Sequence, residues 1–267
     1  MRPMITRLAL LLSLLAAPAA LAQTSTVREE IQVSVAGRPE TWRLVWDGPT
    51  RPFCGLDDLA TADTGPCNGF AYGEQGALFL ERRGADGGLL DRLGLGPAFR
   101  DSDLAGLDIG NAALPRWPVQ DRDGNLAKAG APEIAAFTAR VQARPPVPIM
   151  ALADYDGDGK ALEFLFQTNV LPTSKQYYAA AGIDPTTGRL HLLHSTARPD
   201  RALVLSKAAW QALARGGPPA EVPFWACDDH GADIRQTYWL AAQKGQISVT
   251  IRDYDCASSA LQKEEAW

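Results

Sequence analysis

Short runs in which apolar and polar residues alternate, separated by turns rich in glycine and proline, dominate this sequence of 267 residues. Residues 31–35 alternate in this way, and Trp42, Leu44 and Trp46 fall on one face of the next run, after a turn at residues 36–38. Because successive side chains on a β-strand point to opposite faces, this pattern predicts a β-hairpin. Many short strands joined by such turns predict a mainly β fold with antiparallel strands, either propeller-like or a sandwich. Further strands are predicted at residues 77–82, 89–93, 147–153, 162–166, 177–183, 190–194, 222–227, 236–242 and 246–254.

Two stretches have helical periodicity instead. Residues 132–142 contain an apolar stripe made of Ile134, Phe137 and Val141. Residues 207–215 follow Ser206, a residue type that caps helix N-termini well, and Leu205 and Trp210 are spaced as a hydrophobic staple. We therefore expect two short helices beside the strands.

The N-terminal residues 1–22 have the composition of a secretory signal peptide. Arg2 and Arg7 precede and flank an apolar run that is too short to span a membrane, and small residues stand at positions 20 and 22. The expected mature protein is a single mainly β domain, residues 23–267, exported to the periplasm or the extracellular space.

The net charge argues against two classes of partner. The whole chain carries a net charge of −5, and loss of Arg2 and Arg7 with the signal peptide makes it −7. An acidic chain without a basic patch is a poor candidate for binding nucleic acid or anionic membranes. No later segment is apolar over the length of a membrane span, so we expect none.

The four cysteines all lie in the exported part, where an even number favours disulfide bonds. Of the three possible pairings we predict Cys54–Cys67 and Cys227–Cys256, because each closes a short local loop. The first would staple a long loop over residues 47–75. The chain-entropy model gives about 3–4 kcal/mol for each bond.

One segment indicates a specific chemistry. Asp154, Asp156 and Asp158 stand at alternate positions, and Gly159 follows the third. A tight turn can aim such carboxylates at one point, and calcium accepts irregular cages of carboxylate and carbonyl oxygens. The alternative is a solvated acidic turn, since Asp and Gly are ordinary turn residues. Three neighbouring carboxylates repel one another without a cation, which favours the calcium site.

Two further ligands are predicted for this site. Lys160 would contribute its backbone carbonyl, and the carboxylate of Glu163 would close the cage. In the competing arrangement, Glu163 lies on the solvent face of the following strand, opposite Leu162, Phe164 and Phe166, and water completes the coordination.

The run of residues 152–159, followed by an apolar strand, resembles the calcium loop of FG-GAP and VCBS-type repeats. The resemblance covers roughly 45 residues and implies a loop between two strands of a propeller blade, with the hairpin at residues 177–194 supplying the remaining strands. The family usually places its closing acid at the ninth loop position, here Leu162, whereas Glu163 stands at the tenth. An EF-hand would place a glutamate at the twelfth position, here Leu165.

A second acidic stretch lies within residues 94–130, which we expect to be mostly loop with short strands. Residues 121–125, Asp-Arg-Asp-Gly-Asn, begin like a calcium loop. Leu126 replaces the glycine at the sixth position and no later acid follows, so we interpret this stretch as a plain hairpin turn.

The sequence contains no recognisable catalytic motif. His230 beside Asp228 and Asp229 could be an oriented general base, but no nucleophile is identifiable, and a polar turn beside a disulfide explains these residues as well. His191 and His194 should point to opposite faces of a strand and so share no metal ion. We expect a non-catalytic calcium-binding domain that binds a protein or glycan; the alternatives are a hydrolase that uses His230, or a structural envelope protein.

Overall fold

A computed structural model describes residues 25–54, 70, 72–104, 106–118, 120, 130–171 and 175–267 of the chain. The predicted signal peptide, Cys67 and the acidic stretch at residues 121–125 lie outside these ranges. Within them the protein is mainly β, built from antiparallel sheets and three short α-helices, as the alternating runs predict. This part of the chain contains no helix with the length and apolar character that crossing a membrane requires.

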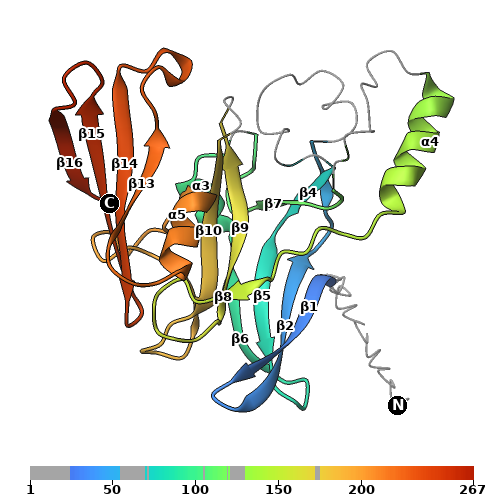
Figure 1. Cartoon of the computed structure of the whole chain (residues 1–267). Helices are drawn as coiled ribbons and strands as arrows, with labels where there is room; N and C mark the ends of the chain where they lie inside the picture. The colour runs from blue at the N-terminus through green and yellow to red at the C-terminus, as the bar shows by residue number, and fades with distance from the viewer. Residues whose placement is uncertain are drawn as a thin grey trace, which may run out of the picture.

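The described residues form four sheets (Figure 1). The N-terminal sheet has the order β1-β2-β5-β6, the small sheet β3-β4-β7, the central sheet β11-β10-β9-β8 with β12 also paired to β10, and the C-terminal sheet β13-β14-β15-β16. The strands are β1 (Ser25–Val35), β2 (Arg38–Asp47), β3 (Arg51–Phe53), β4 (Gly73–Gly76), β5 (Leu78–Arg83), β6 (Leu89–Gly94), β7 (Ala112–Pro115), β8 (Leu152–Ala153), β9 (Glu163–Val170), β10 (Gln176–Ile183), β11 (Leu190–Leu192), β12 (Leu205–Ser206), β13 (Ala220–Trp225), β14 (Ile234–Gln243), β15 (Gln246–Asp255) and β16 (Leu261–Ala266).

The central sheet is covered on both faces, with the N-terminal sheet to one side and the C-terminal sheet to the other (Figure 1). Phe164 and Phe166 on β9 enter the apolar cluster shared with the N-terminal sheet, whereas Leu165 packs against the cluster shared with the C-terminal sheet. Full burial of a phenylalanine side chain contributes about 1.5–3 kcal/mol. The alternation along β9 thus fixes which residues point toward each neighbour.

Both predicted helices are confirmed. The helix α4 (Ala131–Gln142) buries Phe137 and Val141 from its apolar stripe. The helix α5 (Lys207–Ala214) begins after Ser206, whose side-chain oxygen accepts a hydrogen bond from the Ala209 amide, and it lies between the central and C-terminal sheets. The staple residues Leu205 and Trp210 are both fully buried in the core beside the C-terminal sheet.

The structure corrects three expectations about secondary structure. The expected loop over residues 47–75 contains the strand β3 and the start of β4, which are too short to show alternation. The stretch 94–130 contains a helix, α3 (Gly96–Asp101), whose six residues are too few to show helical periodicity. The predicted strand at residues 147–153 is regular only at Leu152–Ala153. Upstream of it, the amides of Ile149 and Met150 donate to the carboxylate of Glu29, so a side chain replaces the neighbouring strand as their partner.

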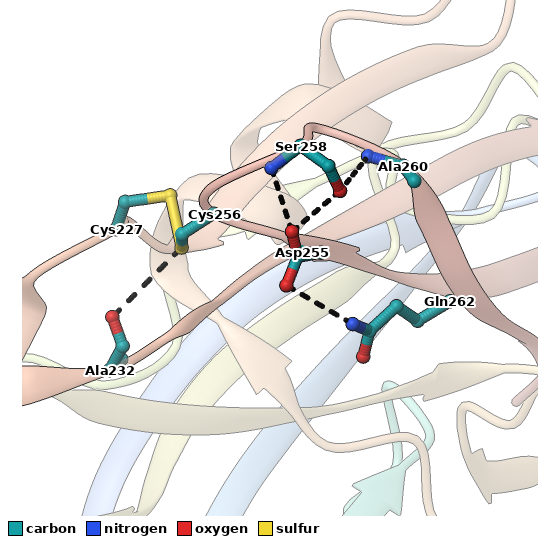
Figure 2. Close-up of a disulfide and its surroundings, with 7 residues drawn as sticks. All are labelled: Cys227, Ala232, Asp255, Cys256, Ser258, Ala260 and Gln262. Atoms are coloured by element: carbon teal, nitrogen blue, oxygen red, sulfur yellow. Dashed lines mark hydrogen bonds between the residues drawn. A yellow bond between two sulfur atoms is a disulfide. The ribbon is translucent and has the colours of Figure 1, made fainter.

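The predicted disulfide Cys227–Cys256 is present and ties the loop after β13 to the end of β15 (Figure 2). Beside it, Asp255 stabilises the turn between β15 and β16, because its carboxylate accepts a hydrogen bond from the Ser258 amide at 2.7 Å. Cys54 is also disulfide-bonded; its predicted partner, Cys67, lies outside the described residues.

Ion pairs attach the turn between β10 and β11 to the N-terminal sheet. The carboxylate of Asp91 on β6 accepts two hydrogen bonds from the Arg189 guanidinium, at 2.8 and 2.9 Å, and one from the Leu190 amide at 2.7 Å. On β5, Arg82 binds both carboxylate oxygens of Glu40 and donates to the carbonyl of Gly188 at 2.7 Å. These contacts hold the end of the central sheet that carries the candidate site.

Candidate metal centre

The acidic segment forms the connection between β8 and β9, as predicted. Its turn requires two glycines in the left-handed region, Gly157 at φ +72° and Gly159 at φ +86°. Residues with a Cβ rarely adopt these angles, so the spacing of the glycines lets the chain reverse direction between the carboxylates. The segment then enters β9 at Glu163, which places that residue beside the loop.

Three carboxylates converge in this connection. Asp154, Asp156 and Glu163 each have a carboxylate oxygen that lies within 4.8 Å of an oxygen of the other two. In the described ranges, no other group of three or more His, Cys, Asp or Glu residues brings its ligand atoms this close together. These three residues could therefore hold a metal ion. Asp156 and Glu163 are each only 1 % exposed, so the group is built into the protein rather than displayed on a solvated turn.

The burial of Glu163 overturns the arrangement in which its side chain faces solvent. In the sheet register, Glu163 pairs with Ala153 on β8 and with Gly182 on β10. An added Cβ on Gly182 would lie 2.6 Å from Cγ of Glu163, so the glycine leaves the space that the glutamate occupies. The sequence pattern did not reveal this, because the partner lies nineteen positions away on another strand.

Backbone amides orient the carboxylates. Asp154 accepts hydrogen bonds from the amides of Gly157 and Gly159 at 2.8 and 2.9 Å, and Glu163 accepts one from the amide of Tyr155 at 3.0 Å. The Oδ1 atom of Asp156 accepts from the Asp158 amide at 3.0 Å. Its other oxygen, Oδ2, is buried and has no hydrogen-bond partner. A buried carboxylate oxygen without a partner is costly, and a bound cation would satisfy it.

The other two predicted ligands, Asp158 and Lys160, make hydrogen bonds within the protein instead of joining the group. The carboxylate of Asp158 lies outside the convergent group and accepts hydrogen bonds from both the amide and the Nζ atom of Lys160, at 2.7 and 2.9 Å. The backbone carbonyl of Lys160 accepts from the Leu162 amide at 3.1 Å. The structure thus brings together three of the five predicted ligand residues, and the lysine ammonium neutralises the fourth.

The electrostatics of the group are those of crowded, buried anions. The pKa of Glu163 is raised to about 8, chiefly by burial; the hydrogen bond from the Tyr155 amide opposes the shift, and the negative charges of Asp156, Asp158 and Asp154 add to it. Burial likewise raises the pKa of Asp156 to about 6, with added repulsion from Asp158 and Asp154. Both shifts show that negative charge at this point is unfavourable when no cation is near.

The loop is also held from outside by the turn between β14 and β15. The amides of Lys244 and Gly245 donate to the carbonyls of Gly157 and Asp156, at 2.9 and 3.1 Å. An added Cβ on Gly157 would lie 2.6 Å from the carbonyl oxygen of Ala242. Sequence reasoning missed this contact, which joins segments almost ninety residues apart.

The histidines correct one expectation. The rings of His191 and His194 do not point to opposite faces but lie edge to face, with centroids 5.9 Å apart. The reason is that β11 ends at Leu192, so strand alternation does not extend to His194. Neither ring belongs to the convergent group of acids.

The proposed general base lies in a short turn. Residues Asp229–Gly231 form a single 3-10 turn after Asp228, whose φ is +63°. The carboxylate of Asp229 pairs with Lys175 at 2.6 Å. The side chain of His230 lies outside the described part of the structure, so its use as a base remains only a hypothesis from the sequence.

We compared the chain with family models, curated proteins and solved structures, and none of the three comparisons found a match.

Proposed function

We propose that this chain is an exported, non-catalytic β-rich protein whose segment 154–163 binds calcium. One observation carries the proposal: Asp156, whose carboxylate forms a group with those of Asp154 and Glu163, has a buried oxygen, Oδ2, without a hydrogen-bond partner. A cation in the middle of this group would satisfy the orphaned oxygen and remove the repulsion between the acids.

The donor set favours calcium among the common cations. The donors are hard carboxylate oxygens without histidine or cysteine, which argues against zinc and copper. The loop is irregular, and calcium tolerates irregular cages of six to eight oxygens better than magnesium tolerates a departure from its octahedron. The resemblance of residues 152–159 to FG-GAP and VCBS-type loops supports the same ion.

In the occupied site, Asp154, Asp156 and Glu163 would bind through their carboxylates. Asp158 would join them once its carboxylate leaves the ammonium of Lys160, and the carbonyl of Lys160 would add a fifth protein ligand. The ion would lock the connection between β8 and β9 in place and so make rigid the end of the central sheet.

The proposed export of the protein rests on evidence outside the metal site. The disulfide Cys227–Cys256 is compatible with an oxidising compartment, and the signal-peptide pattern predicts the route to it.

A protein or glycan partner is also part of the proposal, and exposed aromatic side chains are the groups that would contact it. Among the described tryptophans, Trp42, Trp46 and Trp210 are buried. Trp239 is exposed, and the guanidinium of Arg252 lies over its ring, 5.0 Å from the ring centroid.

Calorimetric titration of the chelator-treated protein with calcium tests the proposal. We expect binding in the micromolar to millimolar range of extracellular modules and sensors. Glu163→Gln should weaken binding at least tenfold, about 1.4 kcal/mol. The matched control is Glu221→Gln on β13, an exposed acid outside the group, which should bind like wild type. Absence of binding at millimolar calcium would reject the site.

A further inference from the structure

The tip of the hairpin formed by β14 and β15 lies on the acidic loop. The two-residue turn consists of Lys244 at φ +53° and Gly245 at φ +78°, closed by the pair Gln243 and Gln246. Two positive φ angles are typical of the tight turn that matches the twist of paired strands. The turn amides therefore point outward, and both donate to the loop rather than to water.

The carbonyls that accept these hydrogen bonds belong to the loop itself. Lys244 donates to Gly157 and Gly245 donates to Asp156, the residue whose carboxylate has the orphaned oxygen. The backbone carbonyl and the side chain of Asp156 thus join the turn on one side to the candidate metal position on the other.

The turn at Gly245 is closely packed against its neighbours. A Cβ on Gly245 would lie 2.3 Å from Cγ of Pro185 and 3.5 Å from Oδ2 of Asp156. Gly245 therefore lies beside the carboxylate oxygen that lacks a partner. On the loop side, an added Cβ on Gly157 would lie 2.6 Å from the backbone carbonyl oxygen of Ala242 on β14, so a shift of the loop must be accompanied by a shift of the turn.

We infer that calcium binding and the docking of the β14–β15 turn are one linked equilibrium. The inference rests on the proposed calcium site. Without the ion, repulsion among the buried carboxylates loosens the loop, and the turn loses the two carbonyls that hold it. With the ion, the backbone of Asp156 is fixed and the turn stays docked. Because linkage is reciprocal, a defect in the turn must weaken calcium binding although the turn supplies no ligand.

The disulfide determines how far the opening can extend. Cys256 directly follows β15, at the end of the hairpin opposite to the turn, and is tied to Cys227 before β14 (Figure 2). The hairpin stays paired at that end, so the opening is confined to its tip and the adjacent loop.

Amide hydrogen exchange on the wild-type protein, with and without calcium, tests the inference directly. The amides of Lys244 and Gly245 should exchange at least tenfold more slowly with saturating calcium. The amide of Gly87 is the internal control, because it donates to Gly84 within the β5–β6 turn and makes no contact with the loop. Its exchange should not change.

A variant tests the reciprocal effect. Gly245→Ala should weaken calcium binding at least tenfold in calorimetry. Gly87→Ala is matched to it, since Gly87 has φ +79° but nothing within 4 Å of an added Cβ, and it should leave binding unchanged. If wild type binds calcium while the Lys244 and Gly245 amides exchange equally in both states, the linkage is wrong and the calcium site stands. If wild type does not bind calcium, both fall.

Discussion

Gly182 on β10 and Glu163 on β9 form a pair in which the absence of one side chain makes room for the other. An added Cβ at Gly182 would lie 2.6 Å from Cγ of Glu163 and equally close to the carbonyl oxygen of Leu162. The glutamate can therefore turn toward Asp154 and Asp156 while remaining 1 % exposed. The missing side chain at Gly182 thus leaves room for the carboxylate of Glu163 in the convergent group.

Gly182→Ala should destabilise the protein by about 1–3 kcal/mol, the usual range for overpacking a well-filled interior. It should also weaken calcium binding, because relief of the clash moves Glu163. Gly94→Ala on β6 is a matched strand control, since its added Cβ would meet only ordinary contacts at 3.5 Å and beyond. Urea denaturation compares the two, and equal stabilities would contradict the role assigned to Gly182.

Lys160→Met should strengthen calcium binding by up to about fivefold, the range expected for loss of an exposed ion pair. The ammonium of Lys160 lies 2.9 Å from Oδ2 of Asp158 and would compete with a bound ion for that carboxylate. Lys160→Arg keeps the charge and should bind like wild type. Calorimetry at low and high salt checks the cause, because the gain should shrink as salt screens the charge.

The stability of the protein in acid should depend on Asp91. Burial alone would raise the pKa of this carboxyl, but hydrogen bonds from Arg189, Leu190 and Arg92 outweigh it and hold the pKa below its usual value. A lowered pKa means that the carboxylate stabilises the fold at pH values above the unfolded-state pKa of about 3.9. This contribution is lost as pH falls through the lower pKa of the folded state.

Asp91→Asn should therefore be less stable than wild type at pH 7, and the difference should narrow below about pH 4. Asp200→Asn, at an exposed position, is the control and should follow wild type throughout. Denaturation midpoints measured from pH 2 to pH 7 give the comparison. A constant difference across this range would show that the charge of Asp91 is not the stabilising element.

The mature protein should contain no free thiol. Titration of the denatured, unreduced exported protein should find none, in line with Cys227–Cys256 and the disulfide-bonded Cys54. Removal of the C-terminal bond by a Cys227→Ala and Cys256→Ala double variant should cost about 3–4 kcal/mol, because 29 residues separate the two cysteines. Two or more reactive thiols would contradict the predicted pairing.

Local patterns in the sequence were enough to predict much of the fold. Alternation located most strands, and the apolar stripe and the Ser206 cap located α4 and α5. Elements without a pattern were missed: α3 is only six residues long, and β16 is mostly exposed and rich in polar residues. The end of β11 at Leu192 could not be predicted either, which is why the relative positions of His191 and His194 were wrong.

In the candidate site, too, local features could be predicted from the sequence and features that depend on distant strands could not. Three aspartates and a glycine in one short segment reveal the loop, because they are local. The burial of Glu163, the space left by Gly182 and the contact with the β14–β15 turn all depend on pairings between distant strands. Sequence spacing alone could not decide between a glutamate that closes the site and one that faces water.

The most direct test of the central claim is a crystal structure of the protein grown in millimolar calcium, with the ion identified by its anomalous scattering. We predict an ion with six to eight oxygen ligands at about 2.3–2.6 Å, among them carboxylate oxygens of Asp154, Asp156 and Glu163, including Oδ2 of Asp156. A structure with no ion at this position, and with Oδ2 of Asp156 still without a partner, would contradict the account.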